Sequence, residues 1–155
     1  MSPLVLLLLA LLGFLLVTAV VTDLRRRQID NGLNAAVALL AVPWWFACGW
    51  GPAAMAWQVG LALVMLLLFA GAFALGMMGG GDVKLIAAVA LWLPPGALLA
   101  MLWWMALGGG LLTVVMLLHH RIGRKEGAIE VPYGLAIAAA TALVMTNHFL
   151  TNQGA

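Results

Sequence analysis

Long apolar segments separated by a few short charged connections dominate this sequence. Every charged residue lies within one of three stretches, 23–30, 82–84 and 121–130. Hydrophobic residues make up 66% of the chain and charged residues 8%, whereas soluble domains hold about half and about a quarter. A chain of 155 residues has too small an interior to bury that excess. These values exclude a soluble globular domain and a disordered chain, and they indicate a membrane protein.

The apolar segments are candidates for membrane-spanning helices, which need roughly 20 apolar residues each. A sixth and shorter segment, Leu85–Leu93, has only nine residues before Pro94. It crosses the membrane only if the glycine run before it, Gly79–Gly81, already lies below the membrane surface. The other five segments have about the required length: Leu4–Thr22, Leu33–Trp50, Met55–Met78, Gly96–Leu118 and Val131–Leu150.

The charge distribution sets the orientation, because Lys and Arg accumulate on the cytoplasmic side of membranes. All three charged connections share that side only if Leu85–Leu93 completes a crossing. We therefore predict an all-α, polytopic membrane protein with six transmembrane helices, the fourth of them short, and both termini outside. The alternative has five crossings and a re-entrant hairpin. It is disfavoured because it puts Arg121, Arg124 and Lys125 outside.

The chain is expected to form a single domain over residues 1–155, since no internal repeat or linker divides it. The first apolar segment has no basic flank before it and no small-residue cleavage site after it. We interpret it as a retained span rather than a secretory signal. The basic residues are few and lie beside apolar spans, so they do not indicate nucleic-acid binding.

Side chains that bind metals or anchor membrane proteins give weaker signals. The single cysteine, Cys48, excludes an internal disulfide and a paired-cysteine zinc site, and it is expected in the core. His119 and His120 are adjacent, so on a helix they point about 100° apart and do not share one ion. We expect no metal site.

The tryptophans fall into two groups. Trp103 and Trp104 are expected to pack inside. Tryptophans near span ends are expected in the membrane interface: Trp44, Trp45, Trp50, Trp57 and Trp92.

Two aspartates beside membrane spans are the strongest candidates for chemistry, because ionisable groups there are costly. Asp82 follows the glycine run and opens the short segment, and Asp23 closes the first span on the same side. Local features alone also allow Asp82 to be an N-cap beside a topogenic Lys84. The glycine run suits a tight bend or the close approach of another chain. Two carboxylates at one site share a proton, so they can activate water as aspartic proteases do.

Three motifs carry a resemblance to a known family. Gly79–Asp82 is similar to the GxGD signature of the type IV prepilin peptidases, which are intramembrane aspartic proteases. Asp23 and the residues after it resemble that family's D-x-x-x-R-x-I-P-N motif, and Val131–Gly134 resembles a third motif. The resemblance covers nearly the whole chain and implies that Asp23 and Asp82 are catalytic. It implies substrate-binding or site-supporting roles for Gly79, Gly80, Gly81, Lys84, Arg27, Asn31, Pro132 and Tyr133.

Two departures from the family pattern shape these expectations. Asp30 stands where the first motif has proline, and it adds a third acid to the same loop. Asp23 is favoured as the partner of Asp82 because its spacing to Arg27 and Asn31 fits the motif, whereas Asp30 is expected to be solvated. The sequence also lacks the N-terminal methyltransferase region with paired cysteines. It is therefore similar to the short, peptidase-only branch that serves Tad/Flp-type pili.

The resemblance implies a protein substrate. Prepilins have a short basic leader, a cleavage site and one apolar helix in the membrane, and they are cut at the cytoplasmic face of the bacterial inner membrane. The resemblance implies no cofactor or metal. It implies that the chain contacts membrane lipid and the pilus or secretion machinery. The competing class is a small membrane scaffold or a proton-coupled transporter component, in which paired acids form a proton relay. That class is disfavoured because no inverted repeat is visible.

Overall fold

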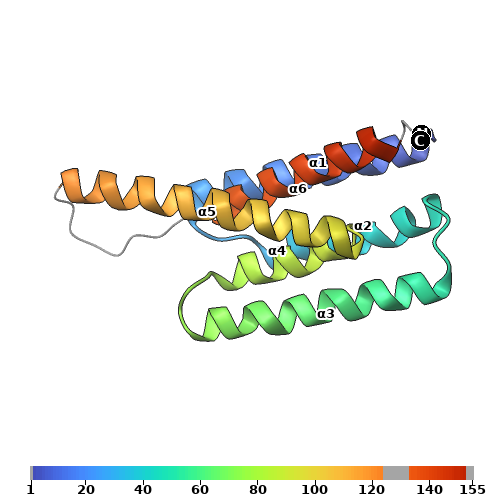
Figure 1. The fold of residues 1–155 in the computed structure, drawn as a ribbon, viewed down its shortest axis with the longest axis horizontal. Helices are drawn as coiled ribbons and strands as arrows, with labels where there is room; N and C mark the ends of the chain where they lie inside the picture. Colours follow the sequence, from blue (N-terminus) through green and yellow to red (C-terminus); the bar gives the residue numbers. More distant parts are fainter. Residues whose placement is uncertain (1, 124–132, 153–155) are drawn as a thin grey trace.

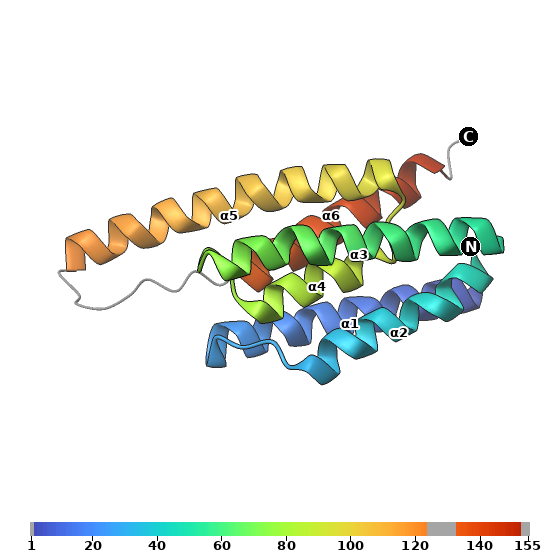
Figure 2. The same cartoon turned by 90° about the horizontal axis from the view of Figure 1, so that it is seen from below.

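The computed structural model describes residues 2–123 and 133–152, and within them the chain forms six helices and no strand. Successive helices run in opposite directions, so that α1 begins and α6 ends at the same end of the bundle (Figure 1; Figure 2). The all-α prediction is therefore confirmed for the described residues. The helices are α1 (Pro3–Arg26), α2 (Asn31–Ala47), α3 (Pro52–Ala74), α4 (Gly80–Ala90), α5 (Pro95–Gly123) and α6 (Tyr133–Asn152).

Local sequence sets the helix boundaries. α1, α3 and α5 each begin at a proline, which suits the first turn because its missing N–H would have no partner there. α1 continues to Arg26, beyond the predicted end at Thr22. It ends because Arg27 adopts the left-handed region, with φ 53°, and its N–H bonds to the carbonyl of Asp23. Asp23 therefore lies in the last turn of the helix rather than after it.

α4 is short and lies at the centre of the bundle. It packs against α2, α3 and α6, while α1 packs against α2 and α6, and α5 packs against α6. In Figure 2, α3 lies on one side of α4, and α1 and α2 lie on the other side. A helix that is apolar around its whole circumference is buried in protein or in a membrane, and its neighbours show that α4 is buried in protein. The buried apolar residues of α4 are Val83, Leu85, Ile86, Ala88, Val89 and Ala90.

The C-terminal end of α4 lies inside the bundle, where its last carbonyls have no partner within the helix. Gln58 of α3 donates through Nε2 to the carbonyls of Ala90 and Leu93. Trp45 of α2 donates through Nε1 to the carbonyl of Leu91 at 2.7 Å. In lipid, such carbonyls must be satisfied by groups of the protein itself. These side chains allow a helix of only 11 residues to end within an apolar interior.

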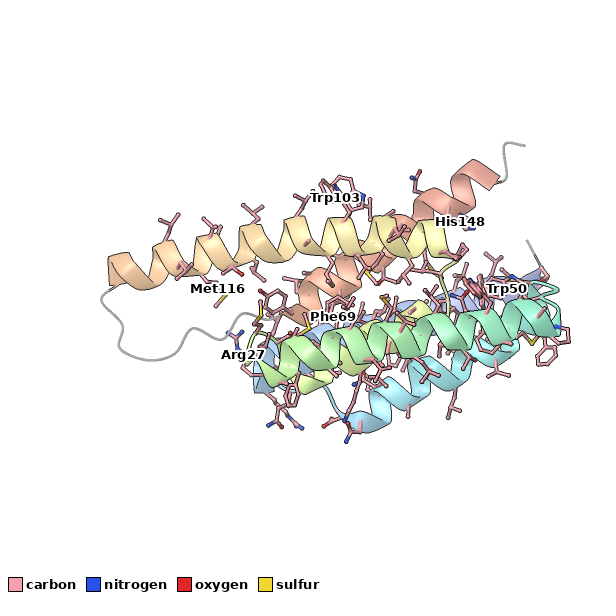
Figure 3. The ribbon with its side chains drawn as sticks, turned by 60° about the horizontal axis from the view of Figure 1, so that its bottom comes forward. Arg27, Trp50, Phe69, Trp103, Met116 and His148 are labelled. Atoms are coloured by element: carbon pink, nitrogen blue, oxygen red, sulfur yellow. The ribbon has the colours of Figure 1, made fainter. Side chains whose placement is uncertain are left out.

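The prediction that Trp44, Trp45 and Trp92 lie in the membrane interface is wrong, because all three are buried inside the bundle. Trp45 and Trp92 are buried, and the indole N–H of Trp92 donates to a backbone carbonyl of α2 at 3.0 Å. Trp44 is buried as well, and its ring lies 5.3 Å from that of Trp92. Trp103 and Trp104, which were expected inside, are exposed, and Figure 3 shows Trp103 pointing away from the bundle. The indole N–H groups of Trp45 and Trp92 thus satisfy backbone carbonyls in the interior.

The outer surface of the bundle is apolar. Large side chains such as Phe14, Leu39 and Leu67 are about two-thirds exposed or more. Apolar surface on this scale suits contact with lipid. Three described helices are long and apolar enough to cross a membrane, namely Pro3–Arg26, Pro52–Ala74 and Pro95–Leu118, and α2 is a shorter apolar helix. These features support a membrane protein, while six crossings and outside termini stay predictions.

Candidate active site

Three segments converge at one end of the bundle and enclose a pocket of about 270 Å³. They are the last turn of α1, the connection from α1 to α2, and the first turn of α4. Arg27 marks this end, whereas Trp50 and His148 lie toward the opposite end (Figure 3). Both predicted catalytic aspartates lie at this cavity. It is lined by Asp23, Arg27, Gln28, Ile29, Asp30, Asn31, Gly79, Gly80, Gly81 and Asp82.

Asp23 is buried in the last turn of α1, where its side chain is 6% exposed. Its Oδ2 accepts a hydrogen bond of 2.9 Å from the backbone N–H of Gly134, at the start of α6. Arg27 is close enough to act on the same carboxylate electrostatically. One carboxylate oxygen is therefore oriented by the backbone of the last helix in the chain.

Asp82 lies in the first turn of α4 and is 7% exposed. It is not the N-cap that the local sequence allowed, because Gly79 occupies that position and provides no side-chain cap. Instead the Asp82 carboxylate reaches back to the backbone N–H of Gly79, as the third residue of a capping box does. Its Oδ1 is buried and has no hydrogen-bond partner. A buried oxygen without a hydrogen-bond partner is costly.

The two aspartates form an electrostatically coupled pair. Asp82 precedes the apolar segment Leu85–Leu93 and lies outside the predicted spans. Burial, and after it the charge of Asp23, raises the pKa of Asp82 to about 7. Asp82 therefore keeps its proton up to near-neutral pH. A pair that holds one proton can act as general acid and general base in the same cycle.

The glycine run allows close approach between two parts of this chain. Gly81 lies against the backbone of Ile29, and a Cβ at Gly81 would be 3.0 Å from the Ile29 carbonyl oxygen. Asn34 of α2 donates through Nδ2 to the Gly81 carbonyl at 3.1 Å. None of the three glycines has a positive φ, and the tight turn before α4 occurs at Gly76, with φ 71°. Close packing of α4 on the α1–α2 connection brings the two aspartates to one pocket.

Two further residues of the first motif lie at the start of α2. Asn31 accepts a hydrogen bond of 2.6 Å from Lys84 Nζ through its Oδ1, which links α2 to α4. Asp30 is the N-cap residue of α2, and its side chain is exposed and makes no capping bond. The expectation that Asp30 is solvated is consistent with this placement.

One comparison with known proteins gives a match, and it covers the residues of this pocket. The profile of the type IV leader peptidase family matches residues 9–123, which hold both aspartates and the glycine run. The chain belongs to the type IV leader peptidase family. Among curated proteins and among solved structures, no match is found. Leader peptidases of this family are aspartic proteases, so the family and the paired carboxylates indicate the same chemistry.

The third leader peptidase motif reaches the site through α6, beyond the matched residues. Tyr133 is half-buried and lies against α5, where a Cβ at Gly109 would be 2.9 Å from Tyr133 Cε1. Pro132 lies outside the described residues. The contact with Asp23 is made by the backbone N–H of Gly134, which follows Tyr133.

Two residues that shape this candidate site were not among the predicted ones. Gly134 is the hydrogen-bond partner of Asp23, and a Cβ there would be 2.7 Å from Asp23 Oδ2. Its place in the third motif was the available signal. Asn34 is 5% exposed and holds the Gly81 carbonyl. Its signal was a polar side chain at the start of an apolar span.

The described part of the chain, 2–118 and 133–148 for side chains, contains no group of three His, Cys, Asp or Glu residues that could hold a metal ion. Cys48, which was expected in the core, is exposed at the end of α2. His119 and His120 lie outside the residues whose side chains are described.

Proposed function

We propose that this chain is an intramembrane aspartic endopeptidase that removes the basic leader peptide from type IV prepilins, with Asp23 and Asp82 as its catalytic pair. The observation that carries the proposal is the meeting of two buried, electrostatically coupled aspartates at one pocket in a member of the leader peptidase family. In this proposal residues 1–155 act as one peptidase domain.

The proposed reaction is acid–base hydrolysis of one amide bond. The ionised Asp23 takes a proton from a water molecule as the water oxygen attacks the carbonyl carbon. Asp82, which holds a proton near neutral pH, gives it to the carbonyl oxygen. The tetrahedral diol then collapses, Asp23 passes its proton to the leaving nitrogen, and a diol hydroxyl returns a proton to Asp82. The unpartnered Oδ1 of Asp82 is the atom that suits the substrate carbonyl.

The supporting residues have positional roles in this proposal. Gly79 orients Asp82, and Gly80 and Gly81 allow α4 to lie close to its neighbours. Lys84 and Asn31 join α4 to α2. Arg27 places positive charge beside Asp23. We propose that Pro132 and Tyr133 set the entry into α6, where the Gly134 N–H holds Asp23.

We further propose that the site faces the cytoplasm from the bacterial inner membrane. The charged connections 23–30 and 82–84 lie at the pocket, and the positive-inside rule assigns that end to the cytoplasm. The alternating helix directions support six crossings with both termini outside (Figure 2). The proposed substrates are Tad/Flp-type prepilins, by resemblance to the peptidase-only branch.

A processing assay tests the proposal. The chain is co-expressed with a Tad/Flp-type prepilin, and the mass of the pilin is followed for the wild type and three variants. Asp23→Asn and Asp82→Asn should abolish processing, while Asp30→Asn should retain it, with all variants inserted in the membrane. Activity in both Asp23→Asn and Asp82→Asn would sink the protease proposal and favour a scaffold or a proton-coupled transporter component. An inactive Asp30→Asn beside an active Asp23→Asn would move the first catalytic acid to position 30.

A further inference from the structure

A second and larger cavity adjoins the acid pocket. It is an apolar groove of about 650 Å³ between α2 and α3, with residues of α4 as its floor. Asn31 lines both the groove and the acid pocket, so the two cavities adjoin at the start of α2. The stretch of α2 from Asn31 to Trp45 is about 21 Å long at roughly 1.5 Å per residue. That length accommodates several turns of a helix.

The lining of the groove is suited to a helix. Its polar residues, Asn31, Asn34 and Lys84, lie near the end that meets the acid pocket, and the rest of the lining is apolar. Alanines from all three helices line it, and small side chains let helix backbones approach closely in membranes. The wall residues Leu39 and Leu63 are 71% and 53% exposed. The groove is therefore accessible from the side of the bundle that faces lipid.

Asn34 adds a feature that points to a hydrogen-bond donor. Its side chain is 5% exposed and lines the groove, and its Nδ2 donates a hydrogen bond to the Gly81 carbonyl. Its Oδ1 is buried and has no partner. A lipid acyl chain carries no donor and would leave this oxygen unpaired, which is costly. The first turn of a helix has backbone N–H groups that lack partners, so the start of a helix supplies what Asn34 needs.

We propose that this groove seats the apolar helix of the substrate directly after the cleavage site, with Asn34 Oδ1 accepting a hydrogen bond from that helix's first turn. The inference rests on the proposed peptidase function and names the surface that selects a substrate with a membrane helix. Because the two cavities adjoin at Asn31, a helix seated in the groove brings the extended residues before it to Asp23 and Asp82.

A comparison of two synthetic peptides tests the groove. The long peptide carries a basic leader, a glycine cleavage site and a Leu/Ala helix of about 20 residues, and the short peptide lacks the helix. Ala38→Leu fills the groove, and Ala56→Leu is the matched control because Ala56 is exposed on α3 outside the groove. Ala38→Leu should raise KM for the long peptide about tenfold, which is about 1.4 kcal/mol. It should leave KM for the short peptide unchanged, and Ala56→Leu should change neither. An equal rise for both peptides, or no rise for the long one, overturns the proposal.

A photo-crosslinking experiment tests binding in the groove independently of cleavage. A photoreactive amino acid replaces Leu63, which lines the groove, or Leu68, which is exposed elsewhere on α3, in the Asp82→Asn protein. The long peptide should crosslink from position 63 and not from 68. If the wild type cuts peptides but position 63 captures only lipid or a second copy of the chain, the groove proposal fails while the peptidase stands. If position 63 captures the long peptide but the wild type cuts nothing, the groove stands and the peptidase fails.

Discussion

The backbone N–H of Gly134 donates a hydrogen bond of 2.9 Å to Oδ2 of Asp23, across 111 positions of sequence. This contact joins the end of α1 to the start of α6 and fixes the orientation of one carboxylate of the pair. A Cβ at position 134 would lie 2.7 Å from that oxygen. Only glycine fits at this position without a clash, because the backbone N–H must come within hydrogen-bond distance of the buried Asp23 side chain.

Gly134→Ala should strongly reduce prepilin processing without removing the protein from the membrane. The added methyl group displaces the Asp23 carboxylate, and a misplacement of about 1 Å at a catalytic group costs about 100-fold in rate. The measurement is the initial rate of processing at matched protein levels. Gly71→Ala is the control, because a Cβ at Gly71 meets nothing within 4 Å. Equal rates in the two variants would contradict the assigned role.

The processing rate should fall as the pH rises through about 7. Burial and the charge of Asp23 raise the pKa of Asp82 from 3.8 to about 7, so the protonated form persists up to that pH and is lost above it. The proposed reaction needs one protonated and one ionised carboxyl group, so the loss of the Asp82 proton removes the acid. A profile of kcat/KM against pH from 5 to 9 gives the measurement, because that ratio reports the pKa values of the free enzyme. A rate that climbs steadily from pH 6 to 8 would be incompatible with Asp82 as the acid.

Gly81→Ala should destabilise the protein. Its Cβ would lie 3.0 Å from the Ile29 carbonyl oxygen, and a backbone neighbour cannot rotate away as a flexible side chain can. We expect a loss of about 1–3 kcal/mol, as for overpacking in a core, seen as a lower Tm in detergent. Gly32→Ala on α2 is the comparison, since its Cβ has open space and alanine favours helix. The idea fails if the two variants unfold at the same temperature.

Gln58→Leu should lower the stability of the bundle more than its size change suggests. The substitution leaves the carbonyls of Ala90 and Leu93 without their donor, and each unpaired buried group costs about 1–3 kcal/mol. Denaturant unfolding of the purified protein measures the loss. Trp57→Leu, at a neighbouring exposed position, should change stability far less. A smaller loss for Gln58→Leu than for Trp57→Leu would show that these hydrogen bonds contribute little.

The two acids could be identified from sequence because charge is rare in an apolar chain. Asp23 and Asp82 each sit at the edge of an apolar segment, and the motif spacing around them separated Asp23 from Asp30. The helical class and the short fourth helix followed from segment lengths and charge placement. These features depend only on residues that are close in sequence, so they could be predicted from one sequence without the structure.

The rest depends on contacts between distant segments. Nothing in the local sequence states that Gly134 meets Asp23, or that Gly81 lies on Ile29 rather than forming a bend. The buried Trp45 and Trp92 were misassigned because tryptophan near a span end is typical of the membrane interface. Their indole N–H groups bond interior carbonyls instead, a use that becomes visible only when the end of α4 is placed.

The anchoring of the far end of α4 restricts how the two carboxylates can change their separation. Gln58 and Trp45 donate to carbonyls at the end of this helix and just after it, so a slide of α4 along its axis would break three hydrogen bonds at once. Asp23 is carried by α1 and tied to α6 through Gly134. Asp82 is therefore carried by a helix that is fixed to α2 and α3 at its far end, whereas Asp23 is fixed to α6.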